Sequence, residues 1–211
     1  MTLSTTSATT TSPFDALAPL RLPAELRLTP EQFEQVCEEN REAVLELAAD
    51  GRLIAMTPTG SETSSRNSEL VFQLKCFARA SGGWKVFESS GGFLLPDGSV
   101  VSPDASLVHL NRWRALTPEQ QRRFAPLCPD LVVELASPGD DGPRGLSALR
   151  KKMAAYQANG ARLGWLLLPD ERAVEIWPAS GQPQRIEYAQ ELAASTEFPG
   201  LRLKLAEIWA A

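Results

Sequence analysis

Histidine and cysteine are scarce in this sequence of 211 residues, and the shortage excludes several kinds of site. A zinc site built on several imidazoles cannot form from His109 alone, and a Ser-His-Asp triad would depend on that one residue. The three cysteines, Cys37, Cys76 and Cys128, are widely spaced and form no CxxC pair. Neither a disulfide framework nor a cysteine zinc site is indicated, and we expect buried, reduced thiols.

Long apolar runs are absent from the sequence as well. No stretch approaches the roughly 20 apolar residues that a membrane-spanning helix needs. Residues 1–13 are rich in serine and threonine and have neither the basic nor the apolar region of a signal peptide. We therefore predict a disordered leader over residues 1–20, a single domain over residues 21–211, no membrane association and a location in the cytoplasm.

Basic residues are outnumbered by acidic ones, 21 to 26, which gives a formal net charge of −5. The acids are concentrated in one segment, where seven of them accompany a single arginine: Glu31, Glu34, Glu38, Glu39, Glu42, Glu46 and Asp50. Subtracting this segment's −6 from the total of −5 leaves +1 for the rest of the chain. The charge therefore permits nucleic-acid binding without predicting it.

Helix and strand signals alternate along the chain. Thr29-Pro30-Glu31-Gln32 predicts a helix with a capping box, and residues 44–56 predict a β-hairpin that turns at Asp50-Gly51. Further helices are expected at residues 60–80, from 117 and at 144–159, and strands at 85–88, 92–95, 100–101, 105–108, 131–135, 163–168, 173–177 and 185–188. This mixture indicates an α/β or α+β fold with one sheet and helices packed against it.

Two acidic residues stand in runs that otherwise read as core strands, Asp104 in Ser-Pro-Asp-Ala-Ser and Glu134 in Asp-Leu-Val-Val-Glu-Leu. A carboxylate is costly to bury unless it is paired or holds a cation. Ala136 shares a strand face with Glu134 and occupies the position where a common nuclease arrangement has lysine. The lysine would then come from the following helix, where Lys152 and Tyr156 lie on one side.

An aspartate, a glutamate and a lysine in this order can carry metal-dependent phosphodiester hydrolysis. Asp104, Glu134 and a backbone carbonyl, that of Leu135, would hold Mg²⁺, which prefers oxygen ligands. Lys152 would orient the attacking water or stabilise the transition state. A structural interpretation stays open, because Asp104 could simply begin a strand and Glu134 could form an ion pair with Arg150 or Lys152.

Six segments, which lie in this order along most of the chain, carry a family resemblance: residues 51–58, 60–63 with Asn67, 102–106, 128–138, Lys152 with Tyr156, and 160–165. Together they resemble the Uma-two family of restriction endonucleases, within the PD-(D/E)XK nuclease superfamily. The resemblance implies a restriction-endonuclease-like core, in which helices flank a central mixed sheet, with an N-terminal helix and β-hairpin. It also implies assembly as a homodimer.

The same resemblance places the family's metal acids on Asp104 and Glu134 and its displaced lysine on Lys152. It implies Mg²⁺ or Mn²⁺ as the cofactor and DNA as the substrate. Glu62 is a candidate further acid of the site, although an acid in a first helical turn is also favourable to the helix dipole. Many family members carry a histidine in the region of residues 61–68, where this sequence has none.

One segment departs from the family pattern. The glycine- and proline-rich loop at residues 138–143 leads late into the lysine-bearing helix, and we expect its Asp140 and Asp141 to be loop acids and not metal ligands. A nucleic-acid-binding or protein-interaction module with a decayed nuclease site is the alternative function, because resemblance in fold does not select among activities.

Overall fold

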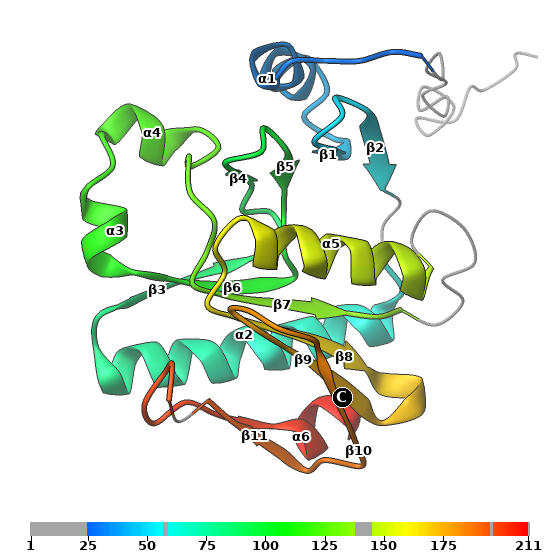
Figure 1. The fold of residues 1–211 in the computed structure, drawn as a ribbon, viewed down its shortest axis with the longest axis vertical. Coiled ribbons are helices and arrows are strands. Elements are labelled where there is room, and N and C mark those ends of the chain that lie inside the picture. The colour runs from blue at the N-terminus through cyan, green and yellow to red at the C-terminus, as the bar shows by residue number, and fades with distance from the viewer. Residues whose placement is uncertain (1–24, 57–58, 138–144, 195, 211) are drawn as a thin grey trace, which may run out of the picture.

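The computed structural model describes residues 25–56, 59–137, 145–194 and 196–210 (Figure 1). The predicted leader and the loop acids Asp140 and Asp141 lie outside these residues. In the described part, no helix combines the length and the apolar character needed to cross a bilayer.

Helices and strands alternate irregularly along the chain. In order they are α1 (Pro30–Glu39), β1 (Val44–Leu47), β2 (Leu53–Met56), α2 (Ser61–Ser81), β3 (Trp84–Glu88), β4 (Phe93–Leu94), β5 (Val100–Val101), β6 (Ala105–His109), α3 (Leu110–Arg114), α4 (Pro118–Arg122), β7 (Leu131–Leu135), α5 (Leu146–Ala158), β8 (Leu163–Leu168), the short 3-10 helix η1 (Pro169–Glu171), β9 (Ala173–Pro178), β10 (Gln184–Glu187), β11 (Glu191–Ala193), β12 (Arg202–Lys204) and α6 (Leu205–Ala210). The expected α/β class is confirmed.

A six-stranded mixed sheet forms the centre of the fold, with strand order β10-β9-β8-β7-β6-β3. β7 and β8 are parallel, and the other neighbouring strands are antiparallel. The two faces of the sheet are covered by different helices (Figure 1). Leu70 and Leu74 of α2 pack on the face that carries Val133, and Met153 of α5 packs on the face that carries Val132. Strand alternation therefore sends Glu134 toward α5.

The N-terminal hairpin does not join this central sheet, so the expectation of a single sheet is wrong. β1 and β2 pair with β5 and β4 in a separate four-stranded sheet of order β2-β1-β5-β4. The physical reason is a core of its own, in which Leu47 of the hairpin packs with Phe33 of α1 and Val100 of β5. A third, two-stranded sheet pairs β11 with β12.

Local signals account for many element boundaries. The predicted capping box at Thr29 is present, and the helix expected from residue 117 begins with a second one at Thr117. The helix α2 ends at Gly82, whose φ of +64° favours glycine. The cysteines are free thiols, but only Cys128 is fully buried and Cys76 is exposed. The thiols were expected to be buried, and the exposure of Cys76 corrects that expectation.

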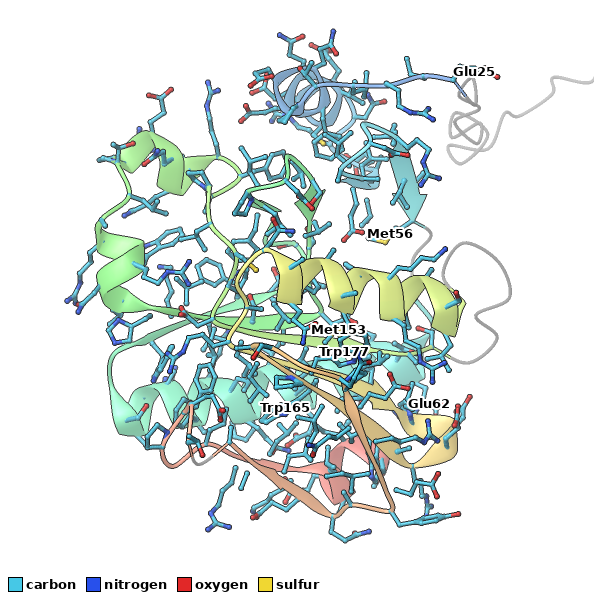
Figure 2. All side chains as sticks on the ribbon, viewed as in Figure 1. Glu25, Met56, Glu62, Met153, Trp165 and Trp177 are labelled. Carbon is cyan, nitrogen blue, oxygen red and sulfur yellow. The ribbon has the colours of Figure 1, made fainter. Side chains whose placement is uncertain are left out.

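A glycine on β8 allows α5 to lie close to the central sheet. A Cβ atom at Gly164 would stand 2.5 Å from Cε of Met153 and 3.4 Å from Cγ2 of Val132. Figure 2 shows Met153 between α5 and the sheet, beside Trp177. Because Lys152 precedes Met153 on the helix, this close packing also fixes the height of Lys152 above β7.

Candidate active site

Glu134 extends from the middle strand of the central sheet into a buried polar cluster. Glu134 is only 3% exposed. Oε1 of Glu134 accepts a hydrogen bond from the Tyr156 hydroxyl at 2.9 Å and lies 2.9 Å from Nζ of Lys152. Burial raises the pKa of Glu134 to about 8, against the opposing effect of the Lys152 ammonium. The carboxyl group therefore keeps its proton to a higher pH than an exposed glutamate does.

Asp104 lies next to Glu134, just beyond the end of a strand ladder. The pairing of β6 with β7 ends at Ala105 opposite Val133. Asp104 is the residue immediately before β6. Its Oδ2 accepts a hydrogen bond from the backbone N–H of Leu135 at 2.8 Å. Its Oδ1 accepts one from Nδ2 of Asn67, on α2, at 3.2 Å. Burial raises the pKa of Asp104, and the hydrogen bond from Leu135 opposes that rise.

The ammonium of Lys152 connects three elements of the fold. Its Nζ lies 2.8 Å from Oε1 of Glu46, 2.9 Å from Oε1 of Glu134 and 3.0 Å from the carbonyl oxygen of Ser102. The side chain is 16% exposed. Burial alone would lower the pKa of Lys152, but Glu134 and Glu46 outweigh burial and the pKa is raised. The structure thus brings the predicted Lys152 and Glu134 together, and Lys152 is a cation at neutral pH.

Glu46 is the member of this cluster that sequence reasoning missed. It lies on β1, is 4% exposed, and accepts a hydrogen bond from the backbone N–H of Ser102 at 2.8 Å. Its Oε1 and that of Glu134 both lie within 2.9 Å of one nitrogen, so the two oxygens are less than 6 Å apart. The available signal was an acid inside the apolar run Val44-Leu45-Glu46-Leu47, the same signal that identified Glu134.

Other candidate residues contact partners that are not members of the cluster. Glu62 lies in the first turn of α2. Its side chain is 60% exposed and pairs with Arg66 (Figure 2). His109 stands at the far end of β6 from Asp104, where its ring packs edge-on against Trp84. Arg150, which was considered as a partner of Glu134, pairs with Glu175.

The donors in the cluster are of the type that binds a hard cation. Among the described residues, no three His, Cys, Asp or Glu side chains are already arranged as a metal-binding group; the Lys152 ammonium lies between two of the carboxylates. All described hydrogen bonds and ion pairs of Glu46 and Glu134 end on Oε1 and none on Oε2. Carboxylate oxygens without histidine or cysteine suit Mg²⁺ or Mn²⁺ better than zinc.

The direction of the Leu135 carbonyl follows from that of its N–H group. The N–H and C=O of one strand residue point to the same side of the strand, and the N–H of Leu135 points to Asp104. β6 is paired only as far as Ala105 opposite Val133. The carbonyl of Leu135 therefore lies beyond the paired part of β6, on the same side as the Asp104 carboxylate.

Comparison with known proteins places this geometry in context. The sequence profile of the family Uma2, whose description is "Putative restriction endonuclease", matches residues 30–206. A similar solved structure is that of a "putative nuclease belonging to DUF820" from Anabaena variabilis, with a TM-score of 0.71 and 18% identity over 87% of this chain and 98% of that chain. The comparison with curated proteins found no match. The structural likeness shows that the two chains share a fold, and the family description agrees with the expected restriction-endonuclease-like core.

Proposed function

The chain belongs to the Uma2 family of "putative restriction endonucleases", and from this we propose that it is a metal-dependent endonuclease that hydrolyses phosphodiester bonds in DNA. One observation carries the proposal: the Lys152 ammonium of α5 lies 2.9 Å from the Glu134 carboxylate of β7, and the Asp104 carboxylate, just before β6, is close enough to influence the pKa of both. A stable fold does not need such a cluster, because buried charges are costly even when they are paired.

Each side chain has a separate task in the proposed reaction. Asp104, Glu134 and the Leu135 carbonyl hold Mg²⁺ or Mn²⁺, and Glu46 contributes a further carboxylate from β1. The cation, when bound, supplies a more acidic water and neutralises charge on the phosphate. Lys152, whose Nζ lies 2.9 Å from Oε1 of Glu134, would donate to the attacking water or to a phosphate oxygen.

Neighbouring groups fix the orientation of these carboxylates. The Tyr156 hydroxyl occupies Oε1 of Glu134, which leaves Oε2 for a cation. Asn67 and the N–H of Leu135 hold one oxygen each of Asp104, and each oxygen keeps a second lone pair. Loss of such supporting groups typically lowers metal affinity or activity by about 10- to 100-fold.

A decayed nuclease site is the competing function, and one observation favours it. Lys152 is engaged by Glu46, Glu134 and the Ser102 carbonyl at once, as expected for a purely structural ion pair. Such a protein could bind DNA or another protein without cleaving it. Homodimer assembly, a cytoplasmic location and a single domain over residues 21–211 stay predictions.

Supercoiled plasmid, linear duplex and single-stranded DNA provide the direct test of cleavage. We expect nicking with Mg²⁺ or Mn²⁺ and none with EDTA. Glu46→Gln should lower the rate by about 10- to 100-fold, because Glu46 contacts the same ammonium as Glu134. Glu42→Gln, an exposed acid just before the same strand, is the matched control and should cleave normally. Intact DNA in every assay, with either metal, would refute the nuclease proposal for these substrates.

The stability of the metal-free protein is expected to fall between about pH 5 and 8. The pKa of Glu134 is about 8 in the folded protein, above its ordinary 4.5, so within this window the folded chain keeps a proton that the unfolded chain has released. This stabilisation is complete below about pH 4.5 and is lost as the pH rises through about 8. Lys152, whose pKa is raised, stays protonated throughout the window.

Thermal unfolding in EDTA measures this effect. The Tm of the wild-type protein should fall more steeply from pH 5 to pH 8 than that of Glu134→Gln, which carries no titrating group at this position. Parallel curves for the two proteins would show that Glu134 is ionised throughout and that its burial is fully compensated by Lys152.

A further inference from the structure

Arg66 is a buried cation whose donors are mostly unused. Its side chain is 8% exposed, and Nη2 donates to Oε1 of Glu62 at 2.5 Å. Nε and Nη1 are buried and have no hydrogen-bond partner in the described part of the chain. A guanidinium group carries five N–H donors in a planar fork, and buried donors are normally satisfied. Arg66 therefore has buried donors available for an acceptor that the described part of the chain does not supply.

The guanidinium group of Arg66 is directed toward the N-terminal end of α2. Helical side chains lean toward the N-terminus, and the contact with Glu62, one turn earlier, has this direction. The helix has 21 residues and begins after Gly60, which makes no side-chain capping bond. Its first-turn N–H groups and its dipole favour an anion at this end.

This helix end also adjoins the acid cluster. Asn67, the residue after Arg66, donates to Oδ1 of Asp104 at 3.2 Å. Successive Cα atoms are only about 3.8 Å apart, so one turn of α2 contacts the cluster through Asn67 and carries the unused donors of Arg66. An anion held by Arg66 would thus be bound by the same turn of α2 that contacts Asp104.

We propose that the N-terminal end of α2, with Arg66 as its main donor, binds a backbone phosphate next to the one that is cleaved. The identity of the ligand as a nucleic-acid phosphate rests on the proposed nuclease function. The Arg66 fork matches two oxygens of a phosphate, and the phosphate takes the place of the Glu62 carboxylate. Glu62 is then a displaceable counterion of Arg66 and not a ligand of the metal.

This arrangement makes opposite predictions for the two partners of one ion pair. Binding is measured by fluorescence anisotropy with a labelled 16-base-pair DNA duplex in EDTA, so that no cleavage is needed. Arg66→Gln should weaken binding about 10-fold. It should also reduce the slope of log K against log[salt] by about one, as expected when one phosphate contact is lost. Glu62→Gln should tighten binding about threefold, because it removes the competing anion. Arg79→Gln, at the exposed far end of α2, should change binding less than twofold.

Binding by Arg66→Gln that matches Arg79→Gln would overturn the proposal, as would unchanged or weaker binding by Glu62→Gln. The Glu62 variant alters an exposed side chain, so it decides the matter even if Arg66→Gln fails to fold. A single-stranded RNA of equal length distinguishes the source of the phosphate, and the same ranking of variants on RNA supports the site. Because no cleavage is measured, an inactive wild-type enzyme would refute the nuclease function and leave this test intact.

If Glu62 instead supplied an acid to the metal site, its variant would behave differently. Under our proposal, Glu62→Gln should cleave plasmid in the presence of Mn²⁺ with the wild-type kcat and a lower KM. A loss of kcat by more than about 10-fold, the size expected for a lost metal ligand or its support, would overturn the proposal and assign Glu62 to the acid cluster.

Discussion

Glu134→Gln is expected to abolish metal-dependent cleavage of DNA, with a fall in rate of at least about 1,000-fold. Glutamine has almost the same shape and can still accept the hydrogen bond from Tyr156, but it carries no charge to hold a divalent cation. The effect is large because the cation would supply both the activated water and much of the charge stabilisation in the transition state. The measurement is nicking of supercoiled plasmid with Mg²⁺ and with Mn²⁺.

Glu175→Gln is a matched control for this experiment. Glu175 is also a buried glutamate of the central sheet and is 5% exposed. It pairs with Arg150 of α5, the helix that carries Lys152. Its replacement should lower the Tm and leave the cleavage rate per folded molecule unchanged. Similar losses of cleavage in both variants would mean that buried charge in general, and not Glu134 in particular, sustains the activity.

Local sequence rules predicted the parts of the fold that depend on neighbouring residues. The capping box at Thr29 and the turn at Asp50-Gly51 are decided within a few residues, and both elements formed at the expected positions. The family resemblance predicted the central mixed sheet correctly. The strands β11 and β12 and the helix α6 were missed, because segments of three to six residues have no clear period of their own and form through packing with distant parts of the chain.

The acid cluster shows the same division between local and distant information. The absence of lysine at Ala136 directed attention to Lys152, and the structure places its Nζ 2.9 Å from Oε1 of Glu134, because a helix that follows β7 and returns across the same face can place a side chain over Glu134. Glu46 could not be placed in this way. Its position depends on the pairing of Leu47 with Val100, about fifty residues later in the sequence, and this contact leaves no mark on the sequence near Glu46.

Lys152→Met is expected to separate the structural role of the lysine from its catalytic role. In EDTA at pH 8.5 the variant should lose about 3 to 5 kcal/mol of unfolding free energy, because Glu46 and Glu134 are left buried without their shared countercharge. Lys151→Met, one residue earlier and exposed, should change the stability by less than about 0.5 kcal/mol. Chemical denaturation with urea gives both values.

Mg²⁺ then distinguishes a catalytic site from a structural ion pair. A cation held by the carboxylates replaces the missing positive charge, so saturating Mg²⁺ should raise the stability of Lys152→Met more than that of the wild-type protein. Cleavage should nevertheless stay at least about 100-fold below wild type, because no ammonium is present to orient the water or stabilise the transition state. If Mg²⁺ leaves the stability of the variant unchanged, the carboxylates do not hold a metal, and the Lys152 cluster is a structural feature of the fold.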